Sequence, residues 1–218
     1  MKHYRVSLFL LVAALSSAGC GSPNKTAKQP SPTATAAGSA TSASNSTLPA
    51  DLNAFLNQYA LTAADLPPGY AVAGQVELAN EQATSGYADP QAVAKEIHDT
   101  GRQGGIAQQV LSPTADAGQI GLTIESFKDA DGAKQWVNKL PTPPSSLKST
   151  PANLPQQLGE QSNATHWTQG DTAGYVVNFR RGRLVFGLGI SAPNGKESLE
   201  PLIALAKKLD DKAKRQAS

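Results

Sequence analysis

Cys20 is the only cysteine in this chain of 218 residues, and it lies where a secretory signal would end. Two positive residues, Lys2 and Arg5, precede an apolar run from Val6 to Leu15, which is too short to cross a bilayer as a stable transmembrane helix. This order predicts a signal peptide over residues 1–19. A sulfur at the next position is either a site for lipid attachment or a free thiol. With no second cysteine, the exported part can form neither an internal disulfide nor a thiolate metal site.

The residues before Cys20 are Leu15-Ser16-Ser17-Ala18-Gly19, and they resemble the lipobox of bacterial lipoproteins, although Ser17 stands where the commonest lipobox has Leu. The resemblance implies a diacylglycerol thioether on the Cys20 sulfur, cleavage before Cys20, and acylation of the freed amine, for example with palmitate. Each buried methylene contributes about 0.8 kcal/mol to membrane binding, so two acyl chains hold a protein at a membrane stably, whereas one chain binds only marginally. We therefore expect a lipid anchor at Cys20 on the extracytoplasmic face of the cell membrane. The alternative is an ordinary signal peptide that leaves a free thiol.

Histidine chemistry has few residues available to it. After removal of the signal only His98 and His166 remain, one late in an expected helix and one beside Trp167 in a polar stretch. A metal or acid–base site built from both would need the fold to bring them together. The sequence contains no G-x-S-x-G elbow, no H-E-x-x-H zinc helix and no P-loop. We therefore expect no metal site and no cofactor.

Acidic pairs are the remaining catalytic candidates, because two carboxylates alone can serve a glycosidase. The pairs are Glu125 with Asp129 and Asp210 with Asp211. Helix caps and solvated helix faces explain these residues more simply. We therefore expect a protein that is not an enzyme, and keep an envelope hydrolase with an unrecognised acid pair as an alternative.

Two glycine-rich segments match the letters of ligand-binding loops. Gly187 to Ala192 fits G-x-G-x-x-A, yet a dinucleotide fingerprint needs a strand-to-helix turn, and here the glycines lie inside a hairpin strand. We interpret Gly187 and Gly189 as making room for a helix against the sheet. Gly101 to Gly105 could present backbone amides and the Arg102 guanidinium to an anion. A helix cap followed by a flexible connector is the simpler interpretation of that segment.

Three arginines, Arg180, Arg181 and Arg183, cluster at the tip of the clearest hairpin in the sequence. Apolar strand patterns flank the tip, and Gly182 supplies a positive φ. Such a cluster could contact anionic lipid headgroups, a cell-wall polymer or an envelope protein, and the alternative is a solvated turn. The domain is otherwise about neutral, since four of the 19 Lys and Arg residues precede residue 49 and leave 15 against 17 Asp and Glu. We therefore expect no nucleic-acid partner.

The chain divides into a leader, a tether and one domain. Residues 21–49 are almost wholly Ser, Thr, Ala, Pro, Gly, Asn and Gln, a composition that cannot bury enough apolar surface to fold. We therefore expect the lipidated cysteine and a disordered tether over residues 20–50, which lets the domain stand off the membrane. Residues 51–218 have a length that suits one domain with a sizeable core.

Hydrophobic periodicity and turn residues predict four helices and five strands in this domain. Asp89 and Asp129 are the expected N-caps of two helices, and Gly101 is an expected C-terminal stop. The expected helices are 51–60, 89–101, 129–140 and 196–215; the expected strands are 70–78 with a bulge near Gly74, 106–111, 119–127, 175–179 and 184–190; residues 145–170 are expected to be loop-rich. Hairpins interrupted by single helices favour an α+β fold, an antiparallel or mixed β-sheet with helices packed on it.

Four short motifs follow one another along the domain: D-L-P-x-G-Y, a helix that ends in Gly-Arg, E-S-F-K-D-A-D-G-A, and F-R-R-G. They are found here at Asp65–Tyr70, Gly101-Arg102, Glu125–Ala133 and Phe179–Gly182. With these motifs the domain resembles a widespread kind of uncharacterised bacterial surface lipoprotein. The resemblance implies export and anchoring, and no known chemistry.

These observations favour a membrane-anchored extracytoplasmic lipoprotein whose domain is a non-enzymatic binding or interaction module of the cell envelope. A carrier of lipid or a small apolar ligand and an envelope hydrolase are the alternatives. An empty apolar cavity would favour the carrier, a cleft with convergent acids would favour the hydrolase, and neither would favour the interaction module.

Overall fold

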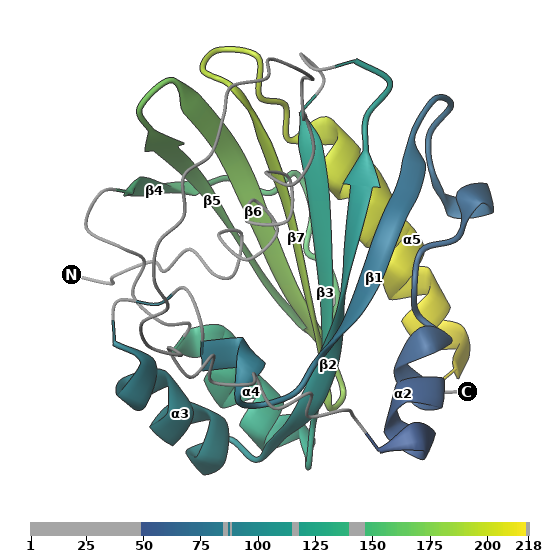
Figure 1. The fold of residues 1–218 in the computed structure, drawn as a ribbon, viewed down its shortest axis with the longest axis vertical. Helices are drawn as coiled ribbons and strands as arrows, with labels where there is room; N and C mark the ends of the chain where they lie inside the picture. The colour runs from purple at the N-terminus through teal and green to yellow at the C-terminus, as the bar shows by residue number, and fades with distance from the viewer. Residues whose placement is uncertain (1–48, 85–86, 88, 115–117, 140–146, 217–218) are drawn as a thin grey trace, which may run out of the picture.

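The computed structural model describes residues 49–84, 87, 89–114, 118–139 and 147–216. Within these ranges seven strands form one antiparallel sheet in the order β1-β2-β3-β7-β6-β5-β4, with helices packed on it (Figure 1). The strands are β1 (Ala71–Leu78), β2 (Arg102–Leu111), β3 (Gln119–Phe127), β4 (Lys148–Ala152), β5 (Gln161–Gln169), β6 (Thr172–Arg181) and β7 (Leu184–Pro193). The helices are α2 (Ala50–Asn57), α3 (Pro90–Asp99), α4 (Ala130–Asn138) and α5 (Glu200–Gln216), with short 3₁₀ turns η2 (Ala63–Asp65) and η3 (Gln82–Thr84). The expected α+β class is confirmed.

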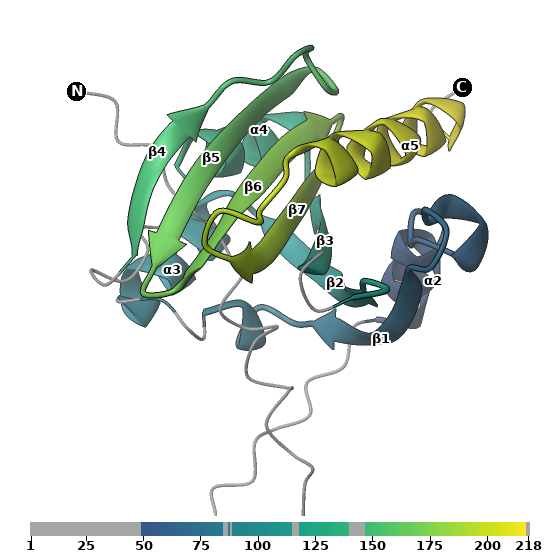
Figure 2. The ribbon, with the colours of Figure 1, turned by 90° about the horizontal axis from the view of Figure 1, so that it is seen from above.

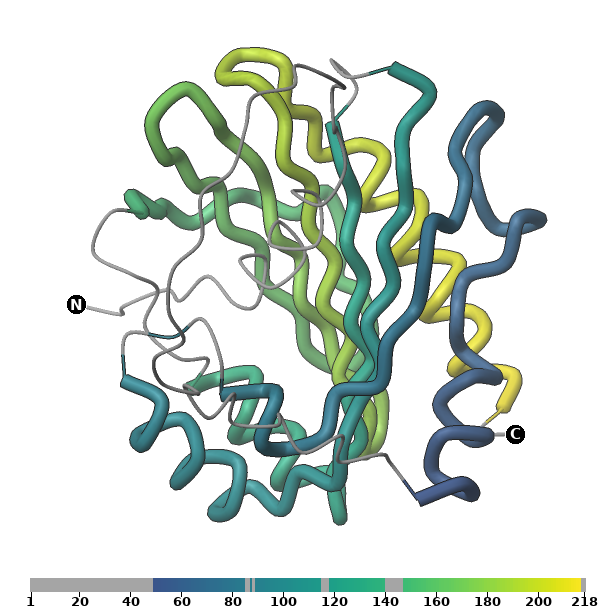
Figure 3. The backbone as a smooth tube through the Cα atoms, in the orientation of Figure 1, coloured from purple at the N-terminus to yellow at the C-terminus, as the bar shows by residue number. Residues whose placement is uncertain are grey.

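The helices cover the two faces of the sheet unequally. α2 and α5 lie on one face, whereas α3 and α4 pack on one end of the opposite face (Figures 1 and 2). The chain after α2 runs beside α5 before it turns into β1 (Figure 3). Lys212 of α5 fixes this arrangement, since its Nζ donates to the carbonyl oxygen of Ala60 at 2.9 Å and to Asp65 Oδ2 at 2.6 Å. In the described ranges no helix is both long enough and apolar enough to span a bilayer.

The larger hydrophobic core lies between the sheet and the α2–α5 face. β3 follows the expected alternation, with Ile120, Leu122 and Ile124 at most 1% exposed and directed into this core. Phe179 and Phe186 of the β6–β7 hairpin stack there with ring centroids 4.7 Å apart. α5 contributes the buried side chains Leu202, Ile203, Leu205, Ala206, Leu209 and Ala213. Each large apolar side chain buried in this way contributes about 1.5–3 kcal/mol, so this face supplies much of the stability.

A smaller core lies under α3 and α4 on the opposite face. Val93 and Ile97 of α3 meet Trp136 of α4 over Phe127 at the end of β3. The Phe127 and Trp136 ring centroids are 5.8 Å apart. The two helices are therefore held to the sheet by one aromatic contact surrounded by aliphatic side chains.

The caps predicted for these two helices are confirmed. The Asp89 carboxylate accepts a hydrogen bond from the Ala92 N–H at 2.9 Å, and the Asp129 carboxylate accepts one from the Gly132 N–H at 2.8 Å. Each bond satisfies a backbone donor that has no partner within the first turn of a helix. Gly101 follows α3 with a φ of 63°, as expected of a C-terminal stop.

Two predicted irregularities of the strands are also confirmed. The register of β1 against β2 shifts between Val72 and Gly74. Gly182 has a φ of 54° in the two-residue turn between β6 and β7, a conformation that favours glycine.

The expectation of a loop-rich stretch over residues 145–170 is wrong, because this stretch contains β4 and β5. β4 is an edge strand of mostly exposed residues, and β5 is polar along most of its length, with Ala164, Thr165 and Trp167 buried. Strand preference reflects the fit to a half-buried pleated surface more than an intrinsic backbone tendency. Small and polar side chains fill such a surface without producing a recognisable apolar alternation.

The last helix begins at Glu200 rather than at the expected Lys196. Glu197 accepts a hydrogen bond from the Gly195 N–H at 2.7 Å and contacts His166 Nε2 at 3.0 Å, which keeps the preceding residues in a loop. α4 ends at Asn138, and Leu140, its expected end, lies outside the described residues.

Candidate functional site

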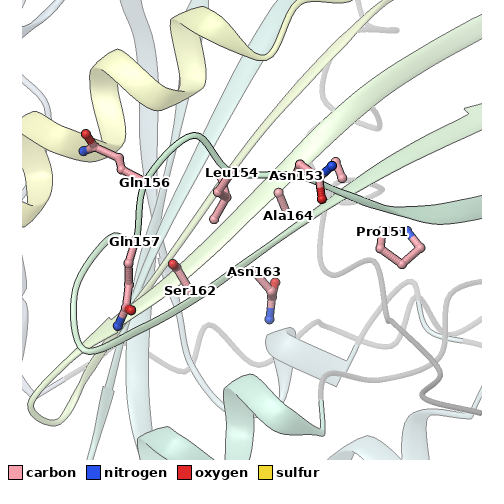
Figure 4. A pocket seen from close by; sticks show the side chains of 9 residues that line it. Pro151, Asn153, Leu154, Gln156, Gln157, Ser162, Asn163 and Ala164 are labelled. Atoms are coloured by element: carbon pink, nitrogen blue, oxygen red, sulfur yellow. The ribbon is translucent and has the colours of Figure 1, made fainter.

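The candidate site is a hollow at one edge of the sheet, between the end of β4, the start of β5 and the loop that joins them (Figure 4). We call it the β4–β5 hollow. Its volume is about 420 Å³. The lining residues are Pro151, Ala152, Asn153, Leu154, Gln156, Gln157, Ser162, Asn163 and Ala164.

The hollow exists because the chain leaves the sheet early. β4 pairs with β5 as far as Ala152, which lies opposite Ala164, while β5 continues to Gln161 in its pairing with β6. After Ala152 the loop carries Leu154 against the larger core. Among the described residues, the edge of β5 from Gln161 to Asn163 therefore has no strand beside it on this side.

Neutral hydrogen-bonding groups dominate the lining, which has four side-chain amides, one hydroxyl and no ionisable side chain among its nine residues. The Asn163 amide is oriented by Asn178, a residue 3% exposed, whose Nδ2 donates to Asn163 Oδ1 at 3.2 Å. The Gln157 amide is oriented by its donation from Nε2 to the carbonyl oxygen of Glu160 at 3.0 Å. Amides held in this way can recognise a polar, uncharged ligand, and they have no proton to exchange as a general acid or base.

Sequence reasoning missed this site, because its residues match no motif and lie in the stretch expected to be loop-rich. The one signal available was a density of amide side chains. Between residues 153 and 163 these are Asn153, Gln156, Gln157, Gln161 and Asn163.

Two of the three arginines at the β6–β7 turn take part in ion pairs within the domain. Arg180 Nη1 lies 2.5 Å from Glu160 Oε2, and Arg181 Nε lies 2.6 Å from Asp210 Oδ1 on α5. Their guanidinium groups therefore fasten the turn to the β4–β5 loop and to α5. Contact with an external anion would have to compete with these carboxylates.

Arg183 is the exposed member of the three arginines. Its guanidinium carbon lies 4.9 Å from the centroid of the Phe55 ring on α2, a cation–π contact. Contact between the tip and an anion or an envelope partner stays a prediction, and Arg183 is the residue best placed for it.

The segment from Gly101 to Gly105 belongs to the end of α3 and the start of β2, so the expected flexible connector is wrong. The Arg102 guanidinium is buried and donates from Nε to Glu125 Oε1 and from Nη1 to Asn80 Oδ1, both at 2.7 Å. Trp136 Nε1 donates to the second Glu125 oxygen at 3.0 Å. The guanidinium thus joins β2 to β3 and α4 and faces no external anion.

The two histidines have separate partners on different elements. His98 Nδ1 lies 3.5 Å from the carboxylate of its neighbour Asp99 on α3. His166 on β5 contacts Glu197 at 3.0 Å and packs on the Tyr175 ring, with centroids 4.8 Å apart. Among the residues that the structure describes, no three metal-binding side chains gather in one cluster.

The acidic candidates have structural roles. Asp129 caps α4, and Glu125 and Asp210 are each paired with an arginine and nearly buried, so the expectation of solvated faces is wrong for these two. Asp211 is exposed and lies 3.4 Å from Lys214 on the same helix.

Gly187 lies in β7 as expected, yet its neighbours are side chains of adjacent strands. A Cβ added there would lie 2.6 Å from Thr123 Oγ1 and 3.2 Å from Asn178 Oδ1. At this position the glycine makes room for polar strand side chains, and the expected helix contact is wrong.

Cys20, the signal over residues 1–19 and most of the tether over residues 20–50 lie outside the described residues. Lipid attachment and the tether therefore stay predictions from the sequence.

No family model matches the chain, and no curated protein matches it in sequence. A solved structure, the extracellular domain of PknH from Mycobacterium tuberculosis, is similar with a TM-score of 0.48 and 11% identity over 73% of this chain and 95% of that chain. This similarity is too low to assign a function.

Proposed function

We propose that the chain is a lipid-anchored extracytoplasmic lipoprotein whose domain docks a component of the cell envelope in the β4–β5 hollow. The observation that carries the proposal is the lining of the hollow. Four neutral amides, two of them held by hydrogen bonds, lie there beside an open strand edge, and none of the nine lining residues is ionisable. Polar groups fixed in this way recognise a ligand without performing chemistry on it.

The anchoring part of the proposal rests on the N-terminal sequence. A positive segment, a short apolar run and Gly19-Cys20 at the junction support export and lipid attachment at Cys20. A tether of roughly 30 residues would then place the hollow some tens of ångströms from the membrane.

The two alternatives have less support from the described residues. A carrier of acyl chains needs an apolar cavity, whereas five of the nine residues that line the β4–β5 hollow have amide or hydroxyl side chains. A hydrolase needs convergent acids, whereas Glu125 and Asp210 are each occupied by a guanidinium.

Photo-crosslinking in the cells that produce the full-length protein tests docking in the hollow. A photoreactive amino acid replaces Asn153, an exposed lining residue. We expect a discrete adduct after irradiation, because a docked component would lie against this side chain. The matched control has the photoreactive residue at Lys134, which is exposed on α4. The same adducts from both positions, or none from Asn153, would contradict the proposal.

A further inference from the structure

The outer edge of β5 has a vacant strand position beside the β4–β5 hollow. β4 pairs with β5 up to Ala152, which lies opposite Ala164. Continuing this register would place Leu154 opposite Ser162, but the chain turns away before that point. Within the described ranges Ser162 is thus paired with a strand on one side only, where it lies opposite Phe179 of β6.

The backbone N–H and C=O of Ser162 point toward this vacant position. A two-residue turn, Gly170-Asp171, joins β5 to β6, and the pair that closes such a turn, Gln169 with Thr172, exchanges hydrogen bonds. Hydrogen-bonded and non-hydrogen-bonded pairs alternate along an antiparallel pair of strands. The odd-numbered residues of β5 therefore exchange backbone hydrogen bonds with β6. The backbone N–H and C=O of the even-numbered residues point away from β6, toward the outer edge. Residues 153–160 make no backbone hydrogen bond to the outward-facing groups of Ser162.

Two of the amide side chains that line the hollow each make a hydrogen bond within the domain. Asn163 uses its oxygen to accept from Asn178, and Gln157 uses its nitrogen to donate within the loop. These two bonds leave the Asn163 NH₂ and the Gln157 side-chain oxygen unused. A peptide group carries one acceptor and one donor, and these match the outward N–H and C=O of Ser162.

We propose that the β4–β5 hollow takes an extended, uncharged segment of a partner protein, which pairs with β5 at Ser162 as an added strand. The inference rests on the proposed docking function and names its ligand. The segment is uncharged because the lining has no charge to compensate one, and burying an unpaired charge is costly. A peptide is favoured over a saccharide because the unpaired backbone groups form a strand edge, and no lining residue has an aromatic ring for a sugar to stack on.

Nuclear magnetic resonance of the ¹⁵N-labelled full-length protein in detergent micelles tests this inference. The probe is an equimolar library of blocked hexapeptides built from Gly, Ala, Val, Ser and Thr. The matched control is the same library with every backbone nitrogen methylated, which removes its donors to the ladder. We expect the unmethylated library alone to shift the amide signals of Ser162 and Asn163 and to slow hydrogen exchange at Ser162. Equal shifts from both libraries, or none from either, would overturn the inference.

Two substitutions at Ser162 separate its backbone from its side chain. Ser162→Ala removes the hydroxyl, and Ser162→Pro removes the hydroxyl and the outward N–H, which a strand edge tolerates. We expect the library to bind Ser162→Pro about tenfold more weakly than Ser162→Ala, the effect of one hydrogen bond. Equal affinities would overturn the inference. If Ser162→Pro lacks a cooperative melt, the methylated library on the unsubstituted protein decides the matter.

A titration with a saccharide distinguishes failure of this inference from failure of the proposed function. The probe is chitotetraose in the same titration. If it shifts the Asn163 and Gln157 signals and the peptides do not, the peptide inference fails and docking in the hollow stands. If no probe shifts them while Asn153 forms its adduct in cells, the inference again fails alone.

Discussion

At the scale of single residues, the pair of Arg102 and Glu125 is the most buried ion pair among the described residues. The two side chains are 0% and 6% exposed, and Nε lies 2.7 Å from the carboxylate. Asn80 and Trp136 satisfy further polar atoms of the pair. Such a pair is stable as a unit, and removal of one partner leaves an uncompensated charge in the core.

We therefore expect Glu125→Ala to lower the free energy of unfolding by about 3–5 kcal/mol. Urea unfolding followed by tryptophan fluorescence measures the change. The matched control is Asp211→Ala, which removes a carboxylate that is 61% exposed and should change stability by no more than about 0.5 kcal/mol. An equal, small effect of both substitutions would show that the buried pair is dispensable.

A second residue-scale prediction concerns Asp210 and acid. Burial alone would raise the pKa of Asp210, but hydrogen bonds from Arg181 and Lys214 outweigh it and hold the pKa below its ordinary value of 3.8. The ionised carboxylate therefore stabilises the fold at pH values above its ordinary pKa. This contribution is lost as the pH falls through the lowered pKa of the folded state. We expect Asp210→Asn to be less stable than wild type at neutral pH, by a margin that shrinks below pH 3.8. Parallel stability curves from neutral to acidic pH would contradict this linkage.

The N-cap residues were predictable because each interacts with a backbone group close to it in the sequence. Asp89 and Asp129 act on N–H groups three residues away, so the sequence around each contains the whole interaction. Arg102 and Glu125 are 23 residues apart and meet through the pairing of β2 with β3. No pattern in one segment indicates such a partner.

At the scale of elements, the predicted strands have local sequence signals, whereas the strands that were missed depend on distant segments. The β6–β7 hairpin has apolar strands on both sides of a two-residue turn with Gly182, so its signals are local. β4 and β5 depend on neighbouring strands for their burial and lack that signal. The β4–β5 hollow lies between the two missed strands, and for this reason the candidate site was missed with them.

The β6–β7 turn also carries a prediction about anions. Arg183→Gln removes the exposed cation and leaves the ion pairs of Arg180 and Arg181 in place. If the tip contacts anionic lipid, a chain beginning at residue 49 should cosediment less with anionic vesicles after the substitution, by up to about 1 kcal/mol at low salt. High salt should remove the difference by screening. Equal cosedimentation of both proteins at low salt would leave the tip as an ordinary turn, and neutral vesicles give the background.

At the scale of the whole molecule, the proposed lipid anchor and the folded domain can be tested separately. The proposed anchor depends on one atom, the Cys20 sulfur, because the chain has no other cysteine. We expect Cys20→Ala to abolish incorporation of labelled palmitate, whereas Ser17→Ala should retain it, since small residues suit that position. Labelling of Cys20→Ala with cleavage at the same junction would show that the lipobox interpretation is wrong.

The domain should fold without the residues before it. The large core and the smaller core are built from residues between Leu52 and Ala213, and the caps and ion pairs that fasten the helices also lie within that range. A chain that begins at residue 49 should therefore melt cooperatively at the same temperature as one that begins at residue 21. For a domain of this size, about 1 kcal/mol shifts the melting temperature by roughly 2–4 °C, so a contribution from the removed residues would be visible in calorimetry. A melting temperature lower by several degrees in the shorter chain would mean that the segment before residue 49 is part of the fold and more than a tether.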